Sequence, residues 1–407
     1  MTSSTLGSSG CSAEFRTDDA NAWKVNGPAP DEAPKTVANA KKRCSAVSGS
    51  REDLLRLNPA RICIIKPSAL GDVVHALPVL NALRSRWPTA RLSWVVNRGL
   101  TGLVEGHPDL DEVIPFDREQ LRPTPGGIAV TARFLAGLRK RRFDLTVDLQ
   151  GLLRTGIMTA ATGAPVRIGL ADAREGATRF YTHRVSTEPD AVHAVDRLLA
   201  VSEALGAETD EPRFVVAATE ADRLWARLTL ASVPGPRLVL NLGARWLTKR
   251  WPPEHFAAIG RKAVDELGAG LIVVGAPEDR PLIETLRAGL GPRPFLDLCG
   301  RTTLPQLAAV AAESDVFLSN DTGPLHLAAA AGAKVVGIYT CTSPEKTGPY
   351  GPRATAIQTG IWCAGSRLKC CSNMECMDEL TPARVWGAVR QSLKPARKTG
   401  LPVLTTA

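Results

Sequence analysis

A short polar turn at residues 319–326 has the composition of an anion-binding loop. Its sequence, Ser-Asn-Asp-Thr-Gly-Pro-Leu-His, follows an apolar run at 315–318 and precedes a helical pattern that ends before Gly332. The first N–H groups of a helix are unpaired and carry partial positive charge, and Gly323 permits a ligand to come close. The turn therefore suits a pyrophosphate, although the same residues could simply cap the helix.

A second turn of this kind lies in the other half of the chain. The strand-like run 61–66 is followed by the turn 67–72 and then by apolar residues at helical spacing from Val73 to Leu83. Two strand-turn-helix units in separate halves predict an α/β fold with two facing parallel sheets. The carboxyl ends of both sets of strands then face a shared cleft, where ligands bind.

The length of 407 residues favours two domains over one. We expect a disordered extension at 1–58, a first domain at 59–232, a second domain at 233–395 after the turn-rich Pro234-Gly235-Pro236, and a flexible tail at 396–407. The apolar runs that predict buried parallel strands are 61–66, 92–96, 112–115, 145–149, 238–241, 271–274, 315–318 and 335–339. A last helix is expected near 382–393, and the sequence does not decide which domain it packs on.

The start of the chain lacks the uninterrupted apolar segment of a secretory signal, and no stretch reaches the roughly 18 apolar residues of a membrane span. We therefore expect a cytoplasmic protein.

The net charge of +9 favours an anionic partner, and many of the cations lie in the first domain. Nucleic acid is a poor candidate, because aromatic residues make up only 5% of the chain and no RNA- or DNA-binding motif is present. An acidic small molecule or an anionic lipid headgroup fits better. The run 139–142 could equally be a solvated helix end. No G-x-G-x-x-G follows either leading strand, which argues against a nicotinamide dinucleotide.

Five segments, in order, resemble the lipopolysaccharide heptosyltransferases of glycosyltransferase family 9. They are Lys66 to Pro78, Asp148 to Arg154, His193 to Arg197, Lys249 to Pro252 and Asp321 to Ala329. The resemblance implies a GT-B fold of two Rossmann-like domains, with the nucleotide sugar on the second and the acceptor on the first. It also implies transfer of heptose from ADP-heptose, without a cofactor, to the anionic Kdo and inner-core region of lipopolysaccharide. Segments 150–154, 173–175 and 193–197 most resemble the enzyme that adds the first heptose.

The resemblance assigns Asp72 as the general base of an inverting transfer. A carboxylate at the mouth of the cleft can take the proton of the attacking hydroxyl. No acid partner is needed, because the leaving nucleoside diphosphate is a stable anion that positive charge can stabilise. The alternative is that Asp72 only stabilises the start of its helix.

The resemblance also supplies substrate-binding residues. Lys249 would contact the donor phosphates, unless it is an ordinary loop cation. Glu278 would accept hydrogen bonds from the ribose, unless it or Asp279 caps a helix. The remaining predicted contacts are Asp321, Thr322, Gly323 and His326 for the donor and Ser68, Arg154 and Arg174 for the acceptor. His326 could instead be a structural histidine of the core. A lipid-linked acceptor further implies contact with the inner surface of the membrane.

Four of the nine cysteines, at 363, 370, 371 and 376, form a cluster without the paired C-x₂-C spacing of a zinc site. We expect a packed loop with reduced thiols and no metal. Pro67, Ala69 and the bulky segment 244–247 depart from the family pattern. Transfer of another sugar, or to another acceptor, and a non-catalytic nucleotide-sugar-binding protein therefore stay open as alternatives.

Overall fold

The computed structural model describes residues 42–117 and 124–393, and within them the chain forms two sheets. The first sheet has the order β1-β7-β6-β5-β2-β3-β4 and is parallel except where β1 pairs with β7. Its strands are β1 (Cys44–Ser48), β2 (Arg61–Ile65), β3 (Arg91–Asn97), β4 (Glu112–Phe116), β5 (Leu145–Asp148), β6 (Val166–Leu170) and β7 (His183–Thr187).

Helices cover both faces of the first sheet. Along β2, Ile62 and Ile64 belong to the core beneath α2, whereas Cys63 and Ile65 pack with residues of α3 and α4 on the other face. Burial on both faces explains why the strands read as continuous apolar runs. The helices of this domain are α1 (Arg51–Leu55), α2 (Leu70–Arg86), η2 (Arg98–Leu103), α3 (Pro125–Lys140), α4 (Leu153–Thr162), η4 (Ala177–Phe180) and α5 (Ala194–Ala204).

The second sheet is parallel throughout its described pairs, in the order β10-β9-β8-β11-β12-β13. The strand order reverses direction between β8 and β11. Open α/β sheets bind their ligands at such a reversal, just beyond the carboxyl ends of the strands. The strands are β8 (Arg237–Asn241), β9 (Gly270–Val274), β10 (Phe295–Asp297), β11 (Val316–Asn320), β12 (Val335–Tyr339) and β13 (Ala354–Gln358).

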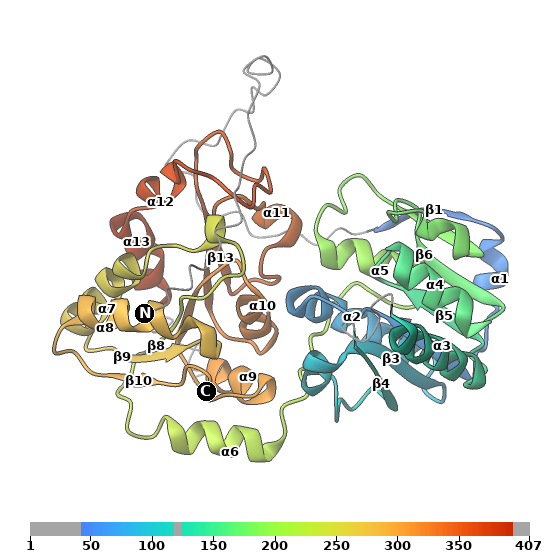
Figure 1. Cartoon of the computed structure of the whole chain (residues 1–407), viewed down its shortest axis with the longest axis horizontal. Helices are drawn as coiled ribbons and strands as arrows, with labels where there is room; N and C mark the ends of the chain where they lie inside the picture. Colours follow the sequence, from blue (N-terminus) through green and yellow to red (C-terminus); the bar gives the residue numbers. More distant parts are fainter. Residues whose placement is uncertain (1–41, 118–123, 394–407) are drawn as a thin grey trace, which may run out of the picture.

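The helices around the second sheet lie on its two faces and at its edges (Figure 1). They are α6 (Glu220–Thr229), η5 (Leu247–Lys249), α7 (Pro253–Leu267), η6 (Pro277–Asp279), α8 (Arg280–Leu290), α9 (Leu304–Ala312), α10 (Gly323–Ala330), α11 (Pro344–Thr347), α12 (Glu375–Glu379) and α13 (Pro382–Leu393). The last of them, α13, packs on α7 and β11, so it belongs with the second sheet.

The expectation of disorder through residue 58 is wrong for its last part. Strand β1 pairs with β7, and α1 follows it. The side chain of Arg43, just before β1, is 1% exposed, and its Nε donates to Asp196 Oδ1 at 2.8 Å. A buried charge needs such a partner, and this ion pair ties the segment before β1 to α5. Residues 1–41 of the predicted extension and the predicted tail at 396–407 lie outside the described residues.

Helix α6 packs against α9 of the second domain, although it precedes the boundary expected at residue 232 (Figure 1). Its Ala226 and the following Leu230 are fully buried. By packing, the chain therefore reaches the second domain before the turn-rich segment that starts at Pro234.

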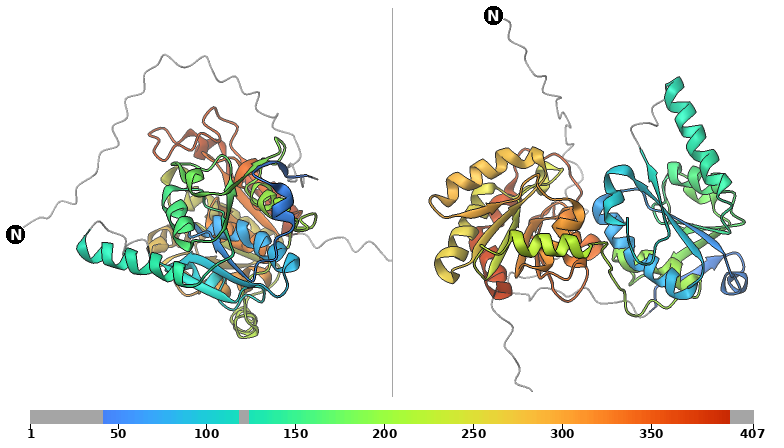
Figure 2. Two further views of the ribbon diagram at one scale, coloured as in Figure 1. Left: turned by 90° about the vertical axis from the view of Figure 1, so that its right-hand side faces the viewer. Right: turned by 90° about the horizontal axis from the view of Figure 1, so that it is seen from below.

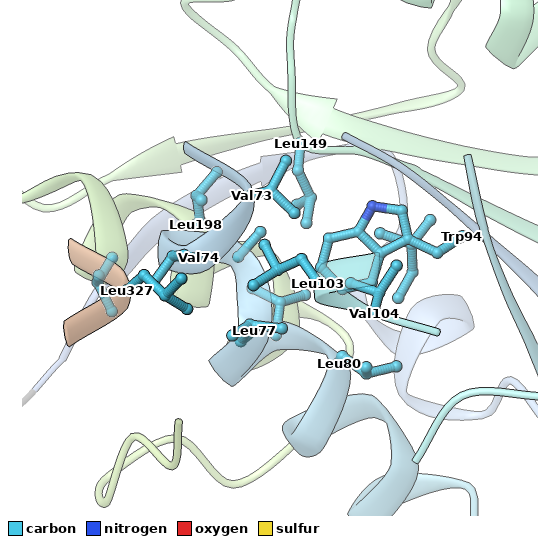
Figure 3. Close-up of a cluster of buried hydrophobic side chains, with 14 of the residues drawn as sticks. Val73, Val74, Leu77, Leu80, Trp94, Leu103, Val104, Leu149, Leu198 and Leu327 are labelled. Carbon is cyan, nitrogen blue, oxygen red and sulfur yellow. The ribbon is translucent and has the colours of Figure 1, made fainter. Parts of the chain in front are cut away.

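The two domains meet where the first turns of α2 and α10 touch. Val74 of α2 and Leu327 of α10 belong to one buried cluster, in which Leu327 approaches α2 from the side of the second domain (Figure 3). A β-carbon on Gly71 would lie 2.6 Å from His326 Cδ2, and one on Gly323 would lie 2.6 Å from Leu70 Cβ. Small residues at these two positions are therefore required for the helices to approach this closely. We call this contact the α2–α10 interface.

Helix α3 stands out from the first domain (Figure 2). Its Ile128 is 63% exposed, and Arg139 and Lys140 of its last turn are exposed as well. Arg141, which follows, pairs with Glu112 (Nη2 to Oε1, 2.8 Å). The run at 139–142 therefore forms a helix end that is mostly solvated. No helix of residues 42–117 and 124–393 is long and apolar enough to cross a membrane.

Candidate active site

The polar turn predicted at 319–326 lies at the carboxyl ends of β8 and β11. Asn241, the last residue of β8, donates from Nδ2 to Ser319 Oγ (2.8 Å) and to Thr322 Oγ1 (3.1 Å). Thr322 is the N-cap residue of α10, and Gly323 begins that helix. The predicted strand-turn-helix unit is confirmed. In this structure the space beside Gly323 is occupied by Leu70 of the first domain.

Asp321 and Lys249, which are far apart in the sequence, form an ion pair at this edge. Lys249 Nζ lies 2.5 Å from Asp321 Oδ2, which also accepts from Thr342 Oγ1 at 2.7 Å. Burial alone would raise the pKa of the Asp321 carboxyl, but the hydrogen bond and charge of His326 and the charge of Lys249 outweigh burial and lower it. The ammonium of Lys249 also lies 4.8 Å from the centre of the Trp246 ring. Lys249 is thus held in a defined position next to the turn.

Glu278 lies in the loop after β9 and is exposed. The neighbouring Asp279 is the residue with a structural role, since its Oδ2 accepts from the N–H of Ala276 at 2.9 Å. Asp279 also lies against Gly243 at the end of β8, where an added β-carbon would meet Asp279 Oδ2 at 2.2 Å. Capping therefore belongs to Asp279, and Glu278 is exposed beyond the carboxyl end of β9.

His326 is buried in the α2–α10 interface and connects the two domains. Its Nε2 lies 3.4 Å from Asp321 Oδ1, and its Nδ1 lies 3.2 Å from Nε2 of His75 on α2. A carboxylate only accepts, so Nε2 of His326 carries a proton. Burial lowers the pKa of His75 well below its ordinary value, and the adjacent His326 and His193 lower it further. His326 is therefore a buried core residue in contact with Asp321, and its contact with the donor stays a prediction.

His193, the N-cap residue of α5, forms a second contact between the domains. Its Nδ1 accepts from the N–H of Val195 at 3.1 Å, so the proton sits on Nε2, which lies 3.0 Å from the carbonyl of Gly348 in the second domain. Burial lowers the pKa of His193 to about 4. The ring of His193 lies 5.3 Å from that of His75. The rings of His75, His193 and His326 thus lie together at the contact between the domains.

Asp72 lies in the first turn of α2, where its Oδ2 accepts from the N–H of Ala69 at 3.0 Å. The side chain is only half-buried, and it lines a cavity of about 590 Å³. Lys66 lines the same cavity and donates from Nζ to the carbonyl of Leu149 at 2.8 Å. Burial lowers the pKa of Lys66, although Asp72 and Asp148 act in the opposite direction. Asp72 thus has the contact of a capping residue and faces the cavity as well.

Of the three predicted acceptor residues, Arg174 lines this cavity. Ser68 is half-buried, and its N–H faces Gln150 Oε1 at 3.4 Å, while Arg154 lies half-buried in the first turn of α4. Neither lines the cavity within the part of the chain that the structure describes. The second domain contributes residues that no motif indicated, namely Lys346, Thr347 and Arg367.

The cysteine cluster lies at the edge of the second domain. Cys363 and Cys376 are buried, whereas Cys370 and Cys371 are exposed. Cys376 and Met377 pack in the core beneath α13. In the two described ranges, no group of three or more His, Cys, Asp or Glu residues is arranged to hold a metal ion.

Two α/β domains of mainly parallel strands, which meet beside the ion-paired Lys249 and the cavity of Asp72, are the arrangement of a GT-B fold. The model of glycosyltransferase family 9 (heptosyltransferase) matches residues 131–377, which is more than half of the chain. The chain is 30% identical to lipopolysaccharide heptosyltransferase 1 of Pseudomonas aeruginosa, over 77% of this chain and 87% of that protein. It is 28% identical to the lipopolysaccharide core heptosyltransferase OpsX of Haemophilus influenzae, over 72% and 82% of the two chains. The protein belongs to glycosyltransferase family 9.

Solved structures support the same fold. A family 9 glycosyltransferase of Veillonella parvula matches with a TM-score of 0.69 and 22% identity, covering 82% of this chain and 97% of that one. The heptosyltransferase WaaC of E. coli with ADP matches with a TM-score of 0.66 and 24% identity, covering 82% and 99%. The predicted GT-B fold and the predicted family are therefore confirmed.

Proposed function

We propose that the protein transfers heptose, with inversion, from ADP-heptose to an anionic sugar of the inner core of lipopolysaccharide. The observation that carries the proposal is the position of Asp72. It lines the cavity that Arg174 also lines, and it belongs to the helix whose first turn touches α10 at the donor-side turn. A base beside the acceptor cavity and a phosphate-binding turn across the interface are what a direct displacement needs.

The chemistry follows from these positions. The acceptor hydroxyl attacks the anomeric carbon of the donor while Asp72 accepts its proton, and the bond from that carbon to the diphosphate oxygen breaks. Lys249 and the N–H groups at the start of α10 stabilise the diphosphate that leaves. Glu278 holds the ribose hydroxyls. Asp321 positions Lys249, and it is close enough to His326 to order the interface at the same time.

The choice of donor rests on relatives. The heptosyltransferase WaaC of E. coli, whose fold is similar, has been solved with ADP and with ADP-2-deoxy-2-fluoro heptose. The acceptor choice rests on cations of the cavity, among which Lys66 and Arg174 would face an anionic saccharide. Ser68 and Arg154, just outside the cavity, would contact more distant parts of the acceptor. A lipid-linked acceptor would place the protein at the cytoplasmic face of the inner membrane.

The test is release of ADP from ADP-heptose with and without Kdo-lipid A, in the wild type and in Asp72→Asn. We expect release only with both substrates, and a rate at least ~10²-fold lower in the variant, because the general base is lost. Asn can still accept the Ala69 N–H through its amide oxygen, so the helix start is preserved. If another nucleotide sugar is turned over and ADP-heptose is not, the proposed donor is wrong and that sugar takes its place. Full activity of Asp72→Asn would remove Asp72 as the base, and binding of the donor without turnover would favour a non-catalytic protein.

A further inference from the structure

Two cations of the second domain lie over the acceptor cavity of the first. Lys346, in α11, and Arg367, in the loop after β13, line the same cavity as Asp72 and Arg174. Both side chains are exposed at the cavity, and both come from segments far from the donor-side turn in sequence. Their presence there means that the cavity is completed only when the two domains are together.

The segment that carries Lys346 is fixed to the first domain. The carbonyl of Gly348 accepts from His193 Nε2 at 3.0 Å, and Tyr350 donates from its hydroxyl to the buried Asp196 at 2.9 Å. These buried contacts lie two and four residues after Lys346. They place α11 at the rim of the first-domain cavity rather than leaving it as a free loop.

Arg367 is fixed from the other side, by the second domain. Its own N–H donates to the carbonyl of Cys341 at 2.6 Å, at the end of β12. The next residue, Leu368, accepts through its carbonyl from Thr248 Oγ1 at 2.7 Å, and Thr248 precedes Lys249. The loop of Arg367 is thus tied to the donor side while its side chain reaches the acceptor cavity.

The charges of the cavity leave a cationic site. Three of its carboxylates already have partners: Tyr181 donates to Asp148 at 2.7 Å, Arg197 pairs with Asp172, and Lys42 lies 3.8 Å from Glu188. In contrast, the ion pairs among residues 42–117 and 124–393 include none for Arg174, Lys346 or Arg367. Asp72 is the remaining carboxylate of the cavity. With Lys66, which in the described ranges bonds only to the carbonyl of Leu149, four cations without a carboxylate partner surround one base and indicate an anionic ligand.

We infer that Lys346 and Arg367, together with Arg174, bind an anionic group of the acceptor, the carboxylate of an acidic sugar, in a site that both domains build. This inference rests on the proposed function and names the carboxylate as the group by which the site recognises the acceptor. An acceptor carrying the carboxylate would bind across the domain contact and hold its hydroxyl next to Asp72. The same cations could also bind the diphosphate of the donor, and the experiment distinguishes this from binding of the acceptor carboxylate.

The test compares Lys346→Ala, Arg367→Ala and the double variant with two acceptors, a soluble Kdo-terminated saccharide and its methyl ester. With the free carboxylate, we expect the KM for the acceptor to rise about tenfold in each single variant, as for loss of a charge-assisted hydrogen bond. We expect kcat and the KM for ADP-heptose to stay nearly constant. With the ester, wild type and variants should have similar KM values. Arg367→Lys, which keeps the charge, should recover part of the loss.

Arg390→Ala is the matched control, because Arg390 is an exposed cation of α13 away from the cavity. Its KM for both substrates should equal that of the wild type. A rise in the KM for ADP-heptose would assign the two cations to the donor diphosphate and overturn the inference. An equal loss with the methyl ester would overturn it as well. If no heptose donor is turned over at all, the proposed function fails, and calorimetric titration of the saccharide into wild type and double variant still decides the inference.

Discussion

The substitution Gly71→Ala tests the α2–α10 interface directly. A β-carbon at Gly71 would lie 2.6 Å from His326 Cδ2, and ordinary contact begins at 3.4 Å, so the ring must retreat by about 0.8 Å. His326 cannot retreat freely, because it is buried and its two nitrogens face His75 and Asp321 at 3.2 and 3.4 Å. The domains must then separate slightly, or these contacts must break.

The sign of the effect makes the test sharp. Alanine is favoured over glycine within a helix by roughly 0.5–1 kcal/mol, so without the interface Gly71→Ala would stabilise the protein. Overpacking in a well-packed contact costs typically about 1–3 kcal/mol. We therefore expect a net loss of about 1–2 kcal/mol, and a lower kcat, since a displacement near 1 Å at a reacting site can cost about 10²-fold.

Gly387→Ala is the control, because Gly387 lies exposed within α13 and an added β-carbon there meets nothing within 4 Å. Thermal unfolding of the two variants should move in opposite directions by a few °C, upward for Gly387→Ala and downward for Gly71→Ala, given about 2–4 °C per kcal/mol in mid-sized domains. Initial rates of ADP release measure the second effect. An increase of the unfolding midpoint in Gly71→Ala as large as that in Gly387→Ala would refute the close contact of the two helices.

Two further predictions concern the ionisable groups of the domain contact. The pKa of His193 is about 4 in the folded protein and about 6.5 when unfolded, so between these pH values the unfolded state binds more protons. The free energy of unfolding therefore falls as the pH drops from about 6.5 to 4, and His193 contributes up to about 3 kcal/mol of this loss. Urea unfolding across that pH range should show the loss, and a His193→Gln variant with the same pH dependence would contradict its assignment to His193. Lys249→Met removes the ammonium that lies 2.5 Å from Asp321 and should weaken donor binding at least about tenfold. Calorimetric titration with ADP checks this, and an unchanged Kd would remove Lys249 from the donor site.

The main strands could be predicted because they are buried on both faces. The eight apolar runs correspond to β2, β3, β4, β5, β8, β9, β11 and β12. The missed strands have a weaker local signal. Strand β6 reads Val-Arg-Ile-Gly-Leu, β10 has only three residues, and β1 exists because it pairs with the distant β7. Pairing with a remote partner leaves no periodicity in the local sequence.

The candidate site likewise has residues that the sequence could predict and residues that it could not. Lys249 and Asp321 each follow a predicted strand, and parallel strands end at one edge, so their proximity could be expected from topology. The sequence does not show whether Glu278 or Asp279 caps the turn after β9, because the two acids are adjacent and only the backbone geometry distinguishes them. Lys346 and Arg367 could not be found, because an isolated cation in a loop carries no pattern. Their position depends on contacts between domains, which a local reading does not contain.

The buried cluster that joins Val74 to Leu327 has a consequence for how the protein unfolds. It is continuous from the helices over the first sheet, through α10, to α9 and α6 of the second domain. If one domain unfolded alone, the apolar side chains of the other at this contact would be exposed to water, at about 25 cal/mol for each Å². We therefore expect the two sheets to unfold together in one cooperative transition, and calorimetry of the whole chain should then record a single peak where two independent domains would give two.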